Sequence, residues 1–201
     1  MERRPTVVEL DRRQLVANLC AVGSLACLGC ARVLAAEGEP DTPPHKFAGA
    51  SGMSFEEVYN FAYARSFIPM MKVLVDEVGL DTIQAAASES VRRVAPARFA
   101  ALPARDMAAW VAVLKTPDPL VDHVLTTEIV DESDTAVEVR ITECLWAKTF
   151  READAADLGY ACICHPDFAM AKAFNPNMRM IRDKTLMEGH SHCNHRWVME
   201  A

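Results

Sequence analysis

Apolar residues in the first half of the chain recur at the three- and four-residue spacing of amphipathic helices. The first such run lies between residues 54 and 79 and contains Val58, Phe61, Ile68, Met71, Val75 and Val78. It follows the capping box Ser54-Phe55-Glu56-Glu57, whose serine and glutamate side chains bond each other's backbone amides. This pattern predicts a helix that begins after Ser54, kinks at Pro69 and ends at Gly79.

Two more helices are predicted before the pattern changes. One begins near Asp81, whose side chain can cap it, and runs to a break at Pro96. The other spans residues 104–114 and is followed by Thr116-Pro117-Asp118-Pro119, which stops helix formation.

From residue 124 onward the apolar period changes from about 3.6 to about 2, which is typical of strands. Residues 124–130 and 136–146 form a predicted antiparallel hairpin, with Cys144 near the far end of its second strand. Residues 178–187 and 193–199 form a second hairpin.

Short helices are predicted between the two hairpins. One spans residues 148–158 and ends at Gly159, and another, which Asp167 can cap, runs to Phe174. The predicted fold class is therefore α+β, with N-terminal helices followed by an antiparallel sheet with short helical insertions.

Composition limits what this fold can do. A chain of 201 residues that is 51% hydrophobic and 24% charged can build one substantial core. The net charge of -7 argues against nucleic acid as a partner, because neutralising phosphates requires clustered lysine and arginine. No apolar run reaches the roughly 18 residues of a transmembrane helix, so none is expected in the mature chain.

The N-terminus has the pattern of an export signal. Arg12-Arg13 precedes an apolar stretch over residues 15–28, and Val33-Leu34-Ala35 is a plausible cleavage site. Residues 1–36 are thus predicted to be a twin-arginine-like signal peptide that engages the twin-arginine export machinery, with a periplasmic or secreted product. A lipid anchor on Cys30 is the second possibility, and a buried N-terminal helix of a cytoplasmic protein is the third.

The rest of the chain divides into a linker and one domain. Residues 37–53 are rich in proline, glycine and alanine, which predicts a flexible linker. Residues 54–201 are predicted to form a single α+β domain.

Thiols and imidazoles gather in the last third of the chain, and both nucleophilic catalysis and metal binding use such groups. Cys164 precedes the helix that Asp167 can cap, where the positive end of the helix dipole would lower a thiol pKa. Cys162 would face the opposite side if that segment is extended. In an oxidising compartment, two disulfides among the four cysteines are the structural alternative; these are Cys144, Cys162, Cys164 and Cys193.

The order and intervals of several short motifs resemble the L-2-amino-thiazoline-4-carboxylic acid hydrolase family, over about residues 54–199. They are Glu143-Cys144-Leu145-Trp146-Ala147, Phe150, Gly159-Tyr160, Cys164-x-x-Asp167, Phe174-Asn175-Pro176, Arg182-x-Lys184-Thr185-Leu186 and Gly189-x-x-x-Cys193. The resemblance implies hydrolytic opening of a cyclic amidine to an N-carbamoyl cysteine. The sequence departs from it at His190, where the family more usually has Asp, and in its export signal.

Catalytic positions carried over from the resemblance are Cys144, Cys164, Asp167 and Cys193. In one mechanism Cys164 attacks as a thiolate, Asp167 transfers protons, and Arg182 or Lys184 holds the substrate carboxylate. In another, a metal-bound water attacks, and the predicted ligands of zinc or iron are Cys144, Cys164, Asp167, Cys193 and His190. The metal mechanism is favoured because exported thiols would otherwise oxidise. The competing function is a non-catalytic module that binds a metal or a small ligand in the periplasm.

Overall fold

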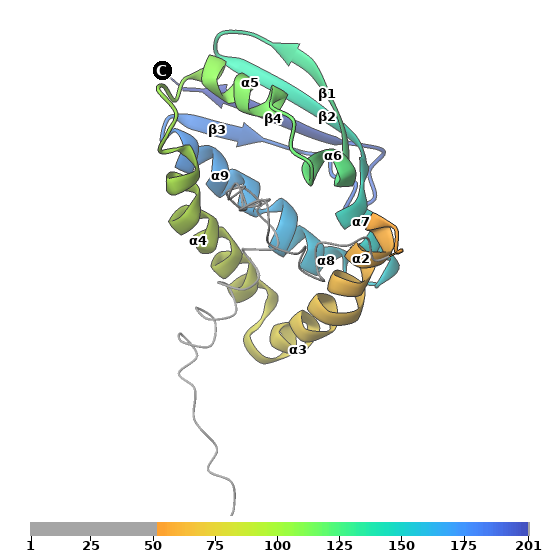
Figure 1. The fold of residues 1–201 in the computed structure, drawn as a ribbon. Helices are drawn as coiled ribbons and strands as arrows, with labels where there is room; N and C mark the ends of the chain where they lie inside the picture. The colour runs from red at the N-terminus through yellow and green to blue at the C-terminus, as the bar shows by residue number, and fades with distance from the viewer. Residues whose placement is uncertain (1–51, 201) are drawn as a thin grey trace, which may run out of the picture.

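The computed structural model describes residues 52–200, and it shows helices that precede and flank one four-stranded antiparallel sheet (Figure 1). The predicted α+β class, with helices first and short helices inserted later, is confirmed. The predicted signal peptide and nearly all of the predicted linker lie outside the described residues. Within residues 52–200, no helix is both long enough and apolar enough to cross a bilayer.

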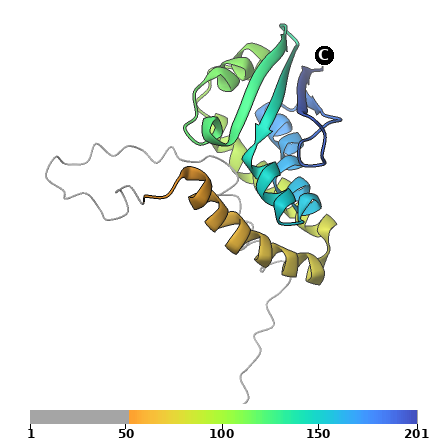
Figure 2. The ribbon, with the colours of Figure 1, turned by 90° about the vertical axis from the view of Figure 1, so that its right-hand side faces the viewer.

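The first helical segment is an arm on the side of the molecule away from the sheet (Figures 1 and 2). It consists of α2 (Phe55–Ala62), the π-helical turn η2 (Tyr63–Phe67) and α3 (Ile68–Val78). The capping box is confirmed, because the Ser54 amide donates to the Glu57 carboxylate at 2.7 Å and the Glu57 amide donates to Ser54 Oγ at 3.2 Å. The arm ends as predicted at Gly79, whose φ of 84° suits glycine.

A π-helical turn lies just before Pro69, the position where a kink is predicted. Proline has no N–H to donate and its ring crowds the carbonyl four residues earlier. The wider π turn places Arg65 in a looser part of the helix, which relieves this conflict.

The predicted break at Pro96 is wrong, because α4 (Leu80–Phe99) continues through it. Ala95 and Phe99 on either side are 1% and 2% exposed, so the last turn is held by its burial in the core. Burying one phenylalanine side chain contributes about 1.5–3 kcal/mol, comparable to the cost of about 3 kcal/mol for an interior proline. The predicted cap at Asp81 is also wrong, since the N-cap residue of α4 is Gly79 and no side chain caps this helix.

Two shorter helices lead from α4 to the sheet: α5 (Met107–Lys115) and α6 (Val121–Val124). The Asp106 carboxylate caps α5 by accepting from the Ala109 amide at 2.9 Å. The third predicted helix is therefore confirmed, with its start moved from residue 104 to residue 107.

The sheet contains β1 (Leu125–Glu132), β2 (Ala136–Cys144), β3 (Met178–Ile181) and β4 (Cys193–Met199) in the order β1-β2-β4-β3. Both predicted hairpins are confirmed, although β3 is shorter than expected and Trp146 lies in a helix instead of β2. Ile141 of β2 pairs with Cys193 of β4, which brings the end of the first hairpin next to the second.

Four helical segments connect the two hairpins: α7 (Leu145–Glu152), α8 (Ala156–Gly159), the π-helical turn η3 (Tyr160–Cys164) and α9 (Pro166–Phe174). The single helix predicted over residues 148–158 is wrong, because the chain turns between α7 and α8 at Asp154, where φ is 49°. Cys162 and Cys164 lie in the π-helical turn, so the extended arrangement considered for them does not occur.

Two hydrophobic cores meet at the end of β2. The larger one lies between the sheet and α4, α5 and α9, and the smaller one packs the arm against α7 and α8. Leu125, Cys144 and Leu186 pack against both cores. The residues of chemical interest therefore lie at a junction that several elements hold in place.

Candidate functional site

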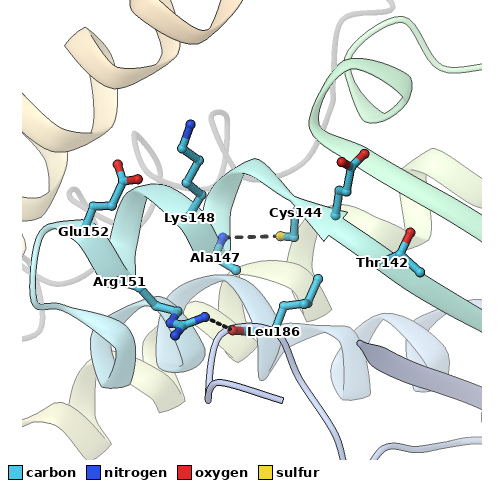
Figure 3. A pocket seen from close by; sticks show the side chains of 8 residues that line it. Thr142, Cys144, Ala147, Lys148, Arg151, Glu152 and Leu186 are labelled. Atoms are coloured by element: carbon cyan, nitrogen blue, oxygen red, sulfur yellow. Dashed lines mark hydrogen bonds between the residues drawn. The ribbon is translucent and has the colours of Figure 1, made fainter. Parts of the chain in front are cut away.

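Cys144 occupies the point where β2 ends and α7 begins. It is the N-cap of α7, and its Sγ accepts a hydrogen bond from the Ala147 amide at 3.3 Å (Figure 3). Burial raises the pKa of the Cys144 thiol to about 11, against the lowering effect of the Ala147 amide. Cys144, at the start of α7, is therefore a thiol that lies at a helix N-terminus.

A cavity of about 480 Å³ opens beside this thiol. It is lined by Thr142, Glu143, Cys144, Ala147, Lys148, Arg151, Glu152 and Leu186 (Figure 3). Its size is that of a small-molecule site, and its lining combines one thiol with side chains of both charges.

Cys164 is not at a helix N-terminus, contrary to the sequence-based prediction. The turn η3 that contains it continues into α9 through His165, whose φ of -61° and ψ of -37° are helical. Burial raises the Cys164 pKa well above its ordinary value, and the negative charge of Asp167 raises it further. The thiol is therefore protonated at neutral pH until a base or a cation acts on it.

Asp167 lies in the first turn of α9 and is held by Arg182. Its Oδ2 accepts from Arg182 Nη1 at 2.9 Å, while Arg182 Nη2 donates to the Cys164 carbonyl at 2.9 Å. Burial raises the Asp167 pKa to about 6, although Arg182 favours the charged form. The predicted capping role is wrong, because His165 is the N-cap of α9 and α9 has no side-chain cap bond.

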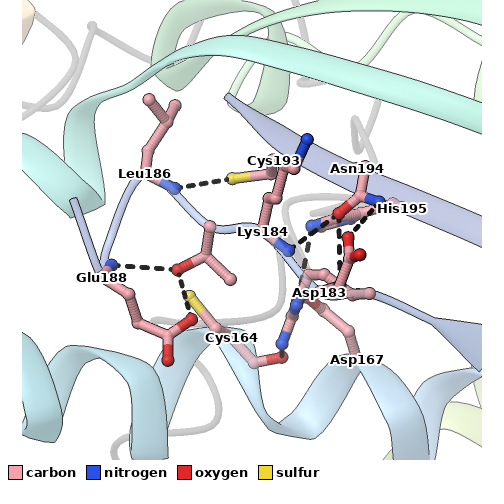
Figure 4. Close-up of polar contacts among 11 residues, drawn as sticks. Cys164, Asp167, Asp183, Lys184, Leu186, Glu188, Cys193, Asn194 and His195 are labelled. Atoms are coloured by element: carbon pink, nitrogen blue, oxygen red, sulfur yellow. Dashed lines mark hydrogen bonds and ion pairs between the residues drawn. The ribbon is translucent and has the colours of Figure 1, made fainter. Parts of the chain in front are cut away.

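Cys193 lies at the start of β4, beside the segment that contains Leu186 (Figure 4), and it acts electrostatically on the Cys164 thiol. Its Sγ accepts from the Leu186 amide at 3.2 Å, and burial raises its pKa. The charge of Asp167 raises the pKa of Cys144, Cys164 and Cys193 alike, so each of the three thiols lies within electrostatic range of this carboxylate. We call Cys144, Cys164, Cys193 and Asp167, the four predicted catalytic residues, the thiol cluster.

His195 joins this region although it was not among the predicted site residues. Its Nε2 lies 3.3 Å from Arg182 Nη1, and burial together with the Arg182 charge lowers its pKa to about 3. Because a guanidinium can only donate, Nε2 is the unprotonated ring nitrogen. The sequence does contain an indication that His195 belongs to the site. His195 follows Cys193 by two residues, which puts both residues on one face of a strand.

The remaining predicted residues lie apart from the thiol cluster or behind it. The Arg182 side chain is 1% exposed and forms an ion pair with Asp167, so it contacts the carboxylate from inside the protein. Lys184 is exposed, with its backbone amide bonded to Asn194 Oδ1 at 2.9 Å. His190 is exposed in the turn before β4, and its Nδ1 lies 3.2 Å from the Thr185 amide.

No three His, Cys, Asp or Glu side chains among residues 52–200 are placed to hold a metal ion together. The described side chains thus do not form a ligand set for zinc or iron, and the metal remains a prediction that elemental analysis can test. None of the four cysteines in this part of the chain is in a disulfide.

Comparison with known protein families gives a match over most of the described domain. The family model described as L-2-amino-thiazoline-4-carboxylic acid hydrolase matches residues 59–197, a range that includes the whole thiol cluster and the cavity. No curated protein and no solved structure matches the chain. Since the family model covers more than half of the 201 residues, the chain belongs to the L-2-amino-thiazoline-4-carboxylic acid hydrolase family, and its membership supports a hydrolase.

Proposed function

We propose that the protein is a hydrolase that opens a small cyclic amidine of the 2-amino-thiazoline type, and that Cys144 is its nucleophile. One observation carries this proposal: the Cys144 thiol lines a cavity of about 480 Å³ at the N-terminus of α7, in a member of a hydrolase family. A thiol at this place can reach a bound molecule, and the amides of the first helical turn stabilise it as charge develops.

In the first step, Sγ of Cys144 forms a bond to the amidine carbon while the thiol loses its proton. The electron pair of the carbon–nitrogen double bond moves to nitrogen and gives a tetrahedral centre. The bond between that carbon and the ring sulfur then breaks, and the sulfur leaves with a proton as a thiol. The product of this step is an isothiourea on Cys144.

In the second step, water adds to the same carbon and Cys144 leaves with a proton. This yields a urea, which for the thiazoline carboxylate is N-carbamoyl cysteine, and restores the thiol. The sum of both steps is the addition of one water molecule to the substrate, with no oxidant or reductant.

Asp167 is the proposed proton-transfer group. Because its pKa is about 6, Asp167 is mostly ionised at neutral pH and can accept a proton. The same pKa is near enough to pH 7 for the protonated carboxyl to give the proton back. It acts electrostatically on the Cys144 thiol, whose pKa of about 11 requires removal of the proton during attack. A cationic amidine bound beside the thiol would also lower its pKa.

Hydrolysis of a panel of cyclic amidines by the full-length protein tests this function. The panel contains 2-amino-thiazoline-4-carboxylate, 2-aminothiazoline and the oxygen analogue of each. Turnover of at least one member is expected, with release of a thiol or an alcohol. Cys144→Ala should reduce kcat on the order of 10³-fold or more, since it removes the nucleophile.

Cys162→Ala is the matched control, because Cys162 is a buried thiol in the smaller core that does not line the cavity. It should keep its turnover per folded molecule, although it unfolds at a lower temperature. If Cys164→Ala removes turnover and Cys144→Ala does not, the nucleophile is Cys164. If panel members bind without any turnover, the protein is the non-catalytic ligand-binding module.

A further inference from the structure

We propose that Arg151 selects substrates that carry a carboxylate, by binding that group at the end of the cavity away from Cys144. This inference rests on the proposed function, since it assigns one end of the same cavity. Neither Arg182, which is bound to Asp167, nor the exposed Lys184 lines this cavity.

The cavity wall is largely one face of α7. The lining residues at the start of this helix and along it are Cys144, Ala147, Lys148, Arg151 and Glu152, at the three- and four-residue spacing of a single helix face. Arg151 lies seven positions after Cys144, which is close to two helical turns and a rise of about 10 Å. Long side chains on a helix lean back toward its N-terminus, which brings the Arg151 guanidinium nearer to the thiol, and a five-membered ring with one substituent is small enough for a cavity of about 480 Å³.

Arg151 is the cation of this wall that has no acidic partner among residues 52–200. Its contact is a weak bond from Nη1 to the Leu186 carbonyl at 3.4 Å (Figure 3). Lys148, by contrast, is bound to the Glu56 carboxylate at 2.6 Å. A guanidinium with most of its donors available can bind a carboxylate through two parallel hydrogen bonds, which a lysine cannot do.

The position of Arg151 also suits this role. Leu186 accepts from Arg151 through its carbonyl and donates from its amide to the Cys193 thiol, so the same residue contacts both the cavity cation and the thiol cluster. Glu143, which directly precedes Cys144, lines the cavity as well, and its negative charge favours the cationic amidine group of the same molecule. The charges of the lining therefore match a zwitterion with a carboxylate at one end and an amidinium near Cys144.

The experiment compares Arg151→Met with wild type on two substrates, 2-amino-thiazoline-4-carboxylate and 2-aminothiazoline, which lacks the carboxylate. The variant should raise KM for the carboxylate about 10- to 100-fold with a smaller change in kcat, and leave 2-aminothiazoline unaffected. Arg140→Met is the matched control, because Arg140 is an exposed arginine of β2 that does not line the cavity and lies 3.9 Å from Glu128. The Arg140→Met variant should keep the wild-type KM and kcat for both substrates.

Binding of thiazolidine-4-carboxylate, measured by calorimetry, separates this inference from the proposed function. This saturated ring keeps the carboxylate but has no amidine to hydrolyse. Loss of its binding in Arg151→Met supports the inference even if the protein hydrolyses nothing in the panel. An unchanged preference for the carboxylate in Arg151→Met, together with unchanged binding of thiazolidine-4-carboxylate, overturns it.

Discussion

Nη1 of Arg182 lies 2.9 Å from Oδ2 of Asp167, and the arginine side chain is 1% exposed while that of Asp167 is 39% exposed. The arginine thus holds the carboxylate from inside the protein and leaves its other side accessible. Burial still raises the Asp167 pKa to about 6, from an ordinary value of 3.8. The folded state therefore loses stability from this group as pH rises across that interval, because the unfolded carboxyl ionises first.

The pH dependence of turnover should report this pair. If ionised Asp167 accepts the proton of the attacking thiol, kcat/KM rises with pH through about 6. Arg182→Met removes a charge that lowers the Asp167 pKa, so the rising limb should move to higher pH, whereas Arg182→Lys should restore it in part. The pH–rate profiles of the three proteins check this, with thermal unfolding to confirm folding. Identical rising limbs would show that Arg182 does not position Asp167.

The thiols themselves should be slow to react in the absence of substrate. A Cys144 pKa of about 11 leaves about 100-fold less thiolate at neutral pH than an ordinary thiol of pKa 9.0. Asp167→Asn removes a negative charge that raises the Cys164 pKa, so alkylation of Cys164 by iodoacetamide should become faster. Peptide-resolved mass spectrometry measures the rates. Asp157→Asn is the control, because Asp157 is exposed on α8, and it should leave the alkylation rate of Cys164 unchanged. Equal alkylation rates in wild type, Asp167→Asn and Asp157→Asn would contradict the electrostatic effect of Asp167 on the Cys164 thiol.

Gly159 allows α8 to pack closely against Phe150 and Met187 of the smaller core. A Cβ there would come within 2.5 Å of Met187 Sδ and 2.8 Å of Phe150 Cγ. Gly159→Ala should therefore lower the free energy of unfolding by about 1–3 kcal/mol, measured by urea denaturation. Adding Met187→Ala should make the effect of Gly159→Ala smaller, because it removes the overlapping side chain.

Met180→Ala is the control for this cycle, since Met180 is also buried but lies in the larger core. Its effect should simply add to that of Gly159→Ala. Additivity of both pairs would show that Gly159 is not packed against Met187.

Local patterns predicted most of the fold because the interactions behind them are local. The capping box at Ser54 and the chain reversal at Gly79 depend on neighbours within a few residues, and both are confirmed. The alternation of Val137, Val139 and Ile141 predicted a strand whose apolar face is buried, and these residues are 0%, 6% and 5% exposed. The position of Cys144 at the end of this strand followed from the same alternation.

The errors arise where distant parts of the chain decide the outcome. Pro96 stays inside a helix because Ala95 and Phe99 are buried against elements far along the sequence. Cys164 does not lie at a helix N-terminus, because a π-helical turn extends α9 backward, and Cys144 instead is the N-cap of α7. The contacts of Arg182 with Asp167 and His195 depend on the packing of α9 against the sheet, which no spacing in the sequence indicates.

Export of the protein remains a prediction from the residues before the described domain. We expect N-terminal sequencing of the natural protein to find a mature chain that begins near Ala36 or Glu37, in the periplasmic or secreted fraction. Replacing Arg12 and Arg13 together by lysine should retain the chain in the cytoplasm if the twin-arginine machinery carries it. A natural protein that keeps Met1 and fractionates with the cytoplasm would contradict export.

The central claim is that Cys144 bonds to the amidine carbon of the substrate during turnover. Rapid acid quenching of the full-length protein in the presence of 2-amino-thiazoline-4-carboxylate, followed by mass spectrometry of the intact chain and its peptides, tests this most directly. We predict a mass increase of one substrate molecule, located on the peptide that contains Cys144 and absent in Cys144→Ala. Turnover of the same substrate with no adduct on any cysteine, and with full activity in Cys144→Ala, would contradict it.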